Sequence, residues 1–287
     1  MIVTLRYALT WFRGQILGWG LGIAALGLIL VPFYDRFQDQ QETFLQMVES
    51  YPPEFMALFG GDAAALATPE GYLNMYGFSL LPIIIGIFAV LAGSGLLASD
   101  EENGRLDLIV AHPVSRLGLF WGRLAAFAGA TLAILVLGWL GFCVLLGASS
   151  LDVGWGEMAL PFLTVLDQAL IFGSLALLLS LILPSRRLAA AGAGIVLVMS
   201  YLLSSMATLN ESLSAIAKLL PYEHFQGGEA LSGLDITSFL GLLAASAVLA
   251  LLAWWRFERR DIRVGGEGSW RLPRLPFGRR SEAEQEA

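Results

Sequence analysis

The sequence predicts an all-α, polytopic membrane protein with six transmembrane helices, cytoplasmic N- and C-termini and additional amphipathic interfacial helices. Three observations support this fold class. Hydrophobic residues make up 56% of the 287 residues and charged residues 14%, against roughly 25% charged residues in a soluble domain. Six apolar stretches are long enough to cross a bilayer core, which takes about 20 helical residues. The basic residues fall almost entirely between alternate stretches, as the positive-inside rule requires.

The composition also excludes other classes of protein. A nucleic-acid-binding protein needs a basic surface, whereas this chain has a formal net charge of −7. A disordered chain could not be so apolar, and a soluble enzyme of this size could not hide so many apolar side chains. Because Cys143 is the single cysteine, it cannot form an internal disulfide, and we interpret it as a small buried hydrophobic residue.

The apolar stretches predict one transmembrane domain, residues 1–255, followed by a basic, flexible cytoplasmic tail, residues 256–287. The first stretch lacks a small-residue cleavage site, so we expect a retained anchor helix and not a cleaved signal peptide. Residues 184–187 form a tight turn between the fourth and fifth spans. The six predicted spans cover residues 14–34, 78–98, 122–147, 165–183, 188–208 and 237–255.

The distribution of charge predicts the orientation of the spans. Fifteen of the 17 Lys and Arg residues lie in the N-terminus, the second-to-third loop, the tight turn and the tail, and only Arg36 and Lys218 lie on the other side. The predicted cytoplasmic segments carry 15 basic and 10 acidic residues, and the outer segments carry 2 basic and 13 acidic residues. The chain is therefore acidic because of its outer loops, and both termini are predicted to be cytoplasmic.

Short helices are expected at both sides of the membrane. In the first outer loop, residues 35–77, Thr68 followed by Pro69 is typical of a helix N-cap and first helical position. We expect the helices of this loop to lie at the outer membrane surface. At the N-terminus, residues 5–12 place apolar side chains on one helical face. This pattern fits either an interfacial helix before the first span or the charged flank of that span.

The second-to-third loop is predicted to hold a short amphipathic cytoplasmic helix. The second span is expected to run unbroken into an acidic segment in which Ser99 and Glu102 have capping-box spacing. Asn103 and Gly104 can kink the helix, and an apolar face then continues until Pro113 ends it. Such a helix, rigidly continuous with a spanning helix, is the lever that a transmembrane motor would need.

Motifs of common catalytic and metal sites are missing from the sequence. There is no G-x-x-x-x-G-K-[ST] motif, so the chain cannot hydrolyse ATP through a P-loop. There is no H-E-x-x-H motif, and His112 and His224 are predicted to lie on opposite sides of the membrane. We therefore expect no enzymatic activity, no catalytic residue and no metal site in this chain.

Asp167 is the one carboxylate inside an apolar stretch, and Gln168 follows it. An acid buried in a membrane is a candidate functional site, for example for an ion or a proton. Pro184 is 17 residues further along, about 25 Å at 1.5 Å per residue. That distance predicts a position near the outer interface, where water or a partner can reach this polar pair.

Residues 101–116 read Glu-Glu-Asn-Gly-Arg-Leu-Asp-Leu-Ile-Val-Ala-His-Pro-Val-Ser-Arg. They resemble the E-E-x-G-T-L-E-L-L-L-x-x-P-V-S-R signature of type-2 ATP-binding-cassette (ABC) exporter permeases, with Arg105 in place of the usual Thr and Asp107 in place of the usual Glu. Residues 219–225, Leu-Leu-Pro-Tyr-Glu-His-Phe, more weakly resemble the L-S-P-F-x-Y-F stretch that the family carries before its last span.

The resemblance implies a permease subunit of an ABC exporter in the plasma (inner) membrane. A separate cytoplasmic ATPase subunit, holding ATP and Mg, would dock on the loop 99–121, while this chain itself binds no cofactor. A second permease copy or paralogue would complete the transporter in the lipid bilayer, with no nucleic-acid partner. The resemblance does not indicate the substrate. The residues that it implies for coupling to the ATPase are Glu101, Glu102, Gly104, Arg105, Leu106, Pro113 and Arg116.

Two other functions stay open. A secondary transporter driven by an ion gradient predicts charges at mid-membrane and broken spans, and here only Asp167 offers such a charge. A non-transporting membrane scaffold or sensor subunit is also compatible with the sequence.

Overall fold

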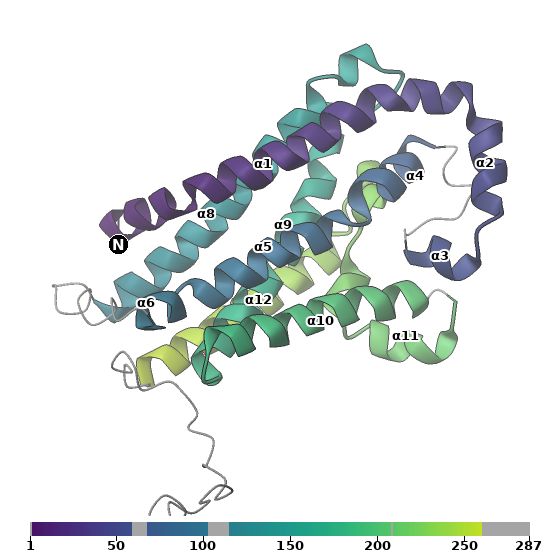
Figure 1. Ribbon diagram of the computed structural model, residues 1–287. Coiled ribbons are helices and arrows are strands. Elements are labelled where there is room, and N and C mark those ends of the chain that lie inside the picture. Colours follow the sequence, from purple (N-terminus) through teal and green to yellow (C-terminus); the bar gives the residue numbers. More distant parts are fainter. Residues whose placement is uncertain (1, 59–67, 103–114, 208, 260–287) are drawn as a thin grey trace, which may run out of the picture.

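The structure is a computed structural model, and it describes residues 2–58, 68–102, 115–207 and 209–259. These parts of the chain form helices and short connections, with no strand among them. The predicted all-α class is therefore confirmed (Figure 1).

Six helical segments are long and apolar enough to cross a membrane, and each overlaps one predicted span. The prediction of a polytopic membrane protein with six spans is thus confirmed. The helices that form them are α1 (Ile2–Asp39), α5 (Leu81–Gly95) with the preceding α4 (Pro69–Leu73) and η2 (Asn74–Phe78), α8 (Arg116–Cys143) with η3 (Leu146–Ala148), α9 (Trp155–Ile182), α10 (Arg186–Ala207) and α12 (Ile236–Arg259).

Shorter helices lie at the two ends of the bundle (Figure 1). We call one end the α6 end, because α6 (Ala98–Glu102) lies there with the start of α8, the α9–α10 turn and the end of α12. The opposite end is the α4 end. It holds α2 (Gln41–Glu49), α3 (Pro53–Leu58), α11 (Glu211–Ala217), η4 (Pro221–His224) and η5 (Gly227–Ser232).

The N-terminal segment belongs to the first spanning helix. α1 runs as one continuous helix from Ile2 to Asp39, with Pro32 inside it. No break separates an interfacial helix from the span. The structure therefore favours the second interpretation of the N-terminal pattern, a charged flank of the anchor helix.

α4 begins with the predicted N-cap, but the helix lies in the bundle and not at the predicted position on the outer membrane surface. The Thr68 hydroxyl oxygen accepts a hydrogen bond from the Gly71 amide at 3.1 Å, and Pro69 opens the helix. The helix was expected at the membrane surface, yet Tyr72 is fully buried and its hydroxyl donates to the Leu30 carbonyl at 3.0 Å. The π-helix η2 continues the chain towards α5, so α4 begins the second spanning segment.

α9 lies at the centre of the bundle and contacts α5, α8, α10 and α12. α1 packs along α8 (Figure 1), where Gly141 lies so close to α1 that a Cβ atom would come 2.3 Å from the Cα of Ala24. Glycine is required there because any side chain would clash with backbone. The small residues thus allow the helices to pack closely.

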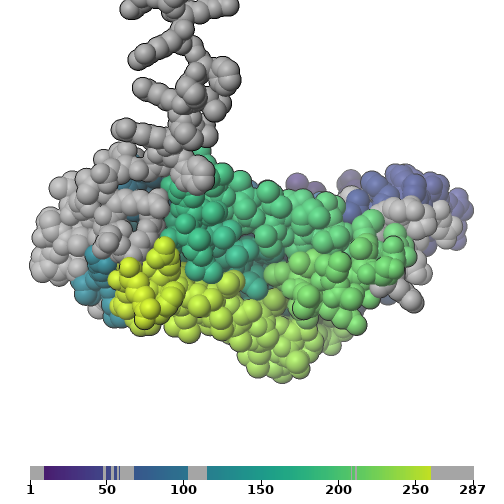
Figure 2. Space-filling model, turned by 90° about the horizontal axis from the view of Figure 1, so that it is seen from below, coloured from purple at the N-terminus to yellow at the C-terminus, as the bar shows by residue number. Residues whose placement is uncertain are grey.

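The outward faces of the bundle are apolar. Exposed leucine, isoleucine, valine and methionine side chains follow one another along α10 and α12, the two helices that contribute to the face seen in Figure 2. Apolar surface of this extent is typical of contact with lipid. The exposed set includes Ile195, Val198, Met199, Leu202, Leu240, Leu243, Val248, Leu251 and Leu252.

Candidate functional site

The connection between the second span and its loop contains a break that the sequence did not predict. α5 ends at Gly95 and α6 begins at Ala98, with Leu96 and Leu97 in the turn between them. The expectation that this span runs unbroken into the loop is therefore wrong. Both leucines are buried in the core, and the Leu96 carbonyl accepts a hydrogen bond from the guanidinium of Arg123. Burial of the turn and this bond from α8 compensate for interrupting the helix.

Ser99 and Glu102 do not form the predicted capping box. Ser99 lies inside α6 and is not its N-cap, and its hydroxyl accepts a hydrogen bond from the guanidinium of Arg186 at 3.1 Å. Glu102 Oε1 accepts a hydrogen bond from the backbone amide of Arg186 at 3.0 Å. Both side chains therefore connect α6 to the first residue of α10.

Asp100 connects α6 to α8 through an ion pair with Arg123. The two side chains are 20% and 12% exposed, respectively, so solvent screens the pair less than it would a surface pair. Together with the contacts of Arg186, this pair attaches the five-residue α6 to two spanning helices at once.

Only part of the predicted coupling set lies in the described chain. Glu101 and Glu102 occupy the end of α6, and Arg116 opens α8, where Ser115 is the N-cap and its hydroxyl accepts from the Gly118 amide at 3.1 Å. The other predicted coupling residues, Gly104, Arg105, Leu106 and Pro113, lie outside the described residues.

Sequence reasoning missed Asp100, Arg123 and Arg186 as members of this site. Both arginines were interpreted as positive flanks that orient the spans, which is their commonest role. The one local signal was the acidic run at residues 100–102, which needs cations nearby. Nothing in the sequence indicates that those cations come from residues 123 and 186.

A second polar site lies inside α9. Asp167 is 1% exposed and Gln168 is 0% exposed. Asp167 follows Trp155 by twelve residues and precedes Ile182 by fifteen, about 18 and 22 Å along the helix axis. The acid thus lies near the middle of α9 and is buried by the surrounding helices. Its position near the outer interface stays a prediction. α9 itself continues through Pro161 and starts ten residues before the predicted span.

The segment 219–225 packs against this polar pair. The Gln168 side-chain amide donates to the Pro221 carbonyl at 2.6 Å, and the Tyr222 amide donates to the Ser200 hydroxyl at 3.0 Å. The Tyr222 hydroxyl donates to the Ser79 carbonyl at 2.6 Å. Burial raises the pKa of Tyr222, so its phenol stays a neutral donor. η4 is thereby held against α9, α10 and the residue that follows η2.

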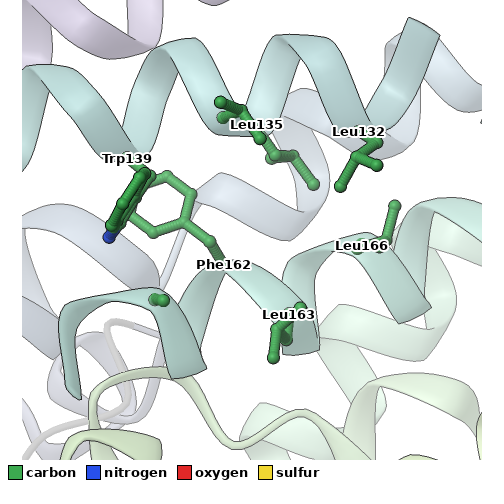
Figure 3. Close-up of a pocket in the computed structure, with 8 residues that line it drawn as sticks. Leu132, Leu135, Trp139, Phe162, Leu163 and Leu166 are labelled. Atoms are coloured by element: carbon green, nitrogen blue, oxygen red, sulfur yellow. The ribbon is translucent and has the colours of Figure 1, made fainter. Parts of the chain in front are cut away.

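An apolar cavity of about 210 Å³ lies between α8 and α9. Figure 3 shows the side chains of the two helices that converge on it. Leu132 and Val136 are exposed, so the cavity opens on the apolar outer face of the bundle. Its lining is Leu132, Leu135, Val136, Trp139, Ala159, Phe162, Leu163 and Leu166.

Metal-ligating residues do not gather elsewhere in the described chain. Across residues 2–58, 68–102, 115–207 and 209–259, no three His, Cys, Asp or Glu side chains lie together so that they could hold a metal ion. The polar chemistry of these segments is therefore that of hydrogen bonds and ion pairs.

These features define a multi-pass helical membrane protein with a braced charged segment at one end of its bundle. Residues 4–258 match the family model described as "Multidrug efflux system permease Rv1217c, C-terminal domain". The chain belongs to this family of efflux permeases. The predictions of a membrane permease and of efflux are thus confirmed. No curated protein matches the chain.

Proposed function

We propose that this chain is the permease subunit of an ABC exporter, driven by ATP that a separate ATPase subunit hydrolyses. The observation that carries the proposal is the double attachment of α6, to α8 through Asp100–Arg123 and to α10 through Arg186. If the loop were hinged freely at both ends, a force applied by the ATPase would move only the loop. A push on α6 is instead passed to two spanning helices.

The proposed orientation places the α6 end and both termini in the cytoplasm of a cell whose plasma membrane holds the protein. In the described chain, the arginines at the α6 end outnumber the two basic residues at the α4 end, Arg36 and Lys218. This distribution supports the orientation through the positive-inside rule. The arginines at the α6 end are Arg13, Arg116, Arg123, Arg186, Arg187, Arg256 and Arg259.

The proposed partners are the ATPase, which would hold ATP and Mg, and a second permease copy or paralogue. The likeness of residues 101–116 to the type-2 signature supports the ATPase as the partner of the loop 99–121. The absence of a P-loop in the sequence supports placing ATP hydrolysis on another chain. Fold alone does not define what is exported.

Co-purification tests the proposal first. The tagged chain, purified in mild detergent from its native membrane, is expected to bring down a protein with a P-loop. Proteoliposomes containing both subunits should then export substrate only with ATP. Recovery of no P-loop protein, together with efflux that persists without ATP, would refute the proposal.

A charge reversal tests the role of α6. The double variant E101K/E102K should keep the complex folded and hydrolysing ATP while export falls about tenfold or more, because the acidic end of α6 no longer fits its partners. The matched control is E223K/E229K, which reverses two exposed carboxylates at the α4 end. Normal export by E101K/E102K would contradict the assignment.

An ion-gradient-driven transporter is the second candidate, and the buried, unpartnered Asp167 favours it. The same proteoliposomes separate the two functions. A secondary transporter would move substrate under an imposed proton or sodium gradient with no ATP present, whereas the exporter would not.

A further inference from the structure

We propose that Asp167 and Gln168 form a binding site for a lipophilic cation that carries N–H donors, such as a protonated amine. The inference rests on the proposed export function and names the chemical class of its substrate. It starts from three oxygen atoms without a hydrogen-bond partner among the described residues: Oδ1 and Oδ2 of Asp167 and Oε1 of Gln168.

The orientation of Gln168 follows from its one partner. The Pro221 carbonyl can only accept a hydrogen bond, so the amide nitrogen of Gln168 must face it. Its carbonyl oxygen then points away from η4. This oxygen and the carboxylate of the adjacent Asp167 can only accept hydrogen bonds.

The protein supplies no cation to these acceptors from the surrounding helices. α5, α9 and the middle parts of α8, α10 and α12 contain no Lys or Arg. The nearest arginines along these helices, Arg123, Arg186 and Arg256, belong to the α6 end. At the α4 end, the His224 imidazole faces the Lys218 carbonyl at 3.1 Å instead. A fully buried acid without a partner is unfavourable and marks a functional position in a membrane.

A cation with N–H groups satisfies this site better than a metal ion or a neutral molecule. An ammonium group has three donors and no acceptor, so it can pair with acceptor oxygens that the described residues leave without a partner. A hydrogen bond between two charged groups is about twice as strong as one between neutral groups. The described residues also lack the cluster of ligands that a metal ion would need.

An apolar cavity next to the site explains why the cation would be lipophilic. Leu163 lies one helical turn before Asp167 and lines the 210 Å³ cavity between α8 and α9. Residues four apart lie on the same side of a helix, so an apolar body in the cavity would bring an attached ammonium to the carboxylate. Asp167 does not itself line the cavity, so side chains of the cavity wall must move for the two groups to meet.

Two fluorescent ligands that differ only in charge test the site. Dansylcadaverine ends in a primary ammonium, and N-hexyl dansylamide has the same length with a methyl group in its place. Their binding to the purified permease, without any ATPase, is measured by dansyl fluorescence in detergent. Asp167→Asn should weaken dansylcadaverine binding about ten- to a hundredfold and change binding of the neutral ligand less than about twofold.

Three further variants control the result. Asp167→Glu keeps the charge and should restore selective binding of dansylcadaverine. Asp152→Asn removes an exposed carboxylate with the same change in net charge and should leave both ligands unaffected. Leu163→Trp fills the cavity and should weaken both ligands together. Elution of each variant as a single sharp peak in size-exclusion chromatography shows that it is folded.

The outcomes separate this inference from the proposed function. If Asp167→Asn binds dansylcadaverine as the wild type does, or weakens binding of both ligands equally, the proposed site is refuted. This conclusion holds whether or not ATP drives export in proteoliposomes. If the charge-selective loss is found but ATP drives no export in proteoliposomes, the site stands and the proposed exporter function fails.

Discussion

The backbone amide of Arg186 donates a hydrogen bond to Oε1 of Glu102 at 3.0 Å, across 84 residues of sequence. The guanidinium of the same arginine donates to the Ser99 hydroxyl at 3.1 Å and to the Leu91 carbonyl at 3.2 Å. One residue at the start of α10 thus holds both α6 and the end of α5. Through these bonds, a displacement of α6 acts directly on the start of α10.

Replacement of Arg186 by alanine should uncouple ATP hydrolysis from export. The variant loses both guanidinium contacts, so motion of α6 reaches α10 only through the backbone bond to Glu102. We expect several-fold less substrate exported per ATP hydrolysed in proteoliposomes, with the rate of ATP hydrolysis retained. The matched control is Arg187→Ala, which removes an exposed neighbouring arginine. An unchanged ratio in Arg186→Ala would show that this contact transmits nothing.

Arg123 and Asp100 should contribute unequally to the stability of the fold. Arg123→Ala leaves the Asp100 carboxylate and the Leu96 carbonyl without their partner, and we expect it to lower the free energy of unfolding by about 1.5–3 kcal/mol. Asp100→Ala should cost less, because Arg123 still donates to Leu96. Denaturant unfolding in detergent of both single variants and the double variant measures their coupling. Equal costs for the two single variants would contradict this order.

Close contact between α5 and α9 depends on glycine at position 93. A Cβ atom on Gly93 would lie 2.2 Å from the Gly173 carbonyl oxygen, and backbone atoms cannot give way as a flexible side chain can. Gly93→Ala should therefore lower the free energy of unfolding by about 1–3 kcal/mol or more. Gly194→Ala in α10 is the control, because a Cβ atom there meets nothing within 4 Å.

The two glycine variants are expected to change stability in opposite directions. Alanine in an open helical position raises stability by about 0.5–1 kcal/mol, so Gly194→Ala should unfold at a slightly higher denaturant concentration than the wild type. If Gly93→Ala does the same, α5 and α9 do not pack as closely as described.

The spans could be predicted from the sequence because their cause is local. A run of about 20 apolar residues belongs in a bilayer whatever its neighbours are, and Thr68 followed by Pro69 forms a helix start from its own side chain and ring. The break at residues 96–97 could not be predicted this way, since two leucines continue an apolar helix pattern. It depends on a bond from Arg123, which is 27 residues away.

The candidate site was predicted only in outline for the same reason. The acidic end of α6 and the acid in α9 are visible in the sequence as charges in unusual places. Their partners are not, because Arg186 meets Ser99 across 87 residues and Pro221 meets Gln168 across 53. The start of the fourth span was predicted ten residues too late, since α9 continues through Pro161.

The hydroxyl of Tyr222 should stabilise the attachment of η4 below about pH 10. Tyr222→Phe removes the 2.6 Å hydrogen bond to the Ser79 carbonyl but keeps the amide bond to Ser200 and the ring contact with Tyr201. Because Ser79 is buried, its carbonyl loses a partner that water does not replace. We expect a loss of about 1–2 kcal/mol in the free energy of unfolding at neutral pH.

The pH dependence of this loss follows from the pKa of the phenol. Burial raises the pKa of Tyr222 in the folded state, so the unfolded chain ionises first, at about pH 10. The stabilisation by the hydroxyl is therefore complete below pH 10 and is lost as the pH rises towards the folded value. Denaturant unfolding of wild type and Tyr222→Phe should show a constant difference between pH 6 and 9 and a smaller one above pH 10. A difference that grows above pH 10 would mean that the phenolate, and not the neutral phenol, is the favoured form in the fold.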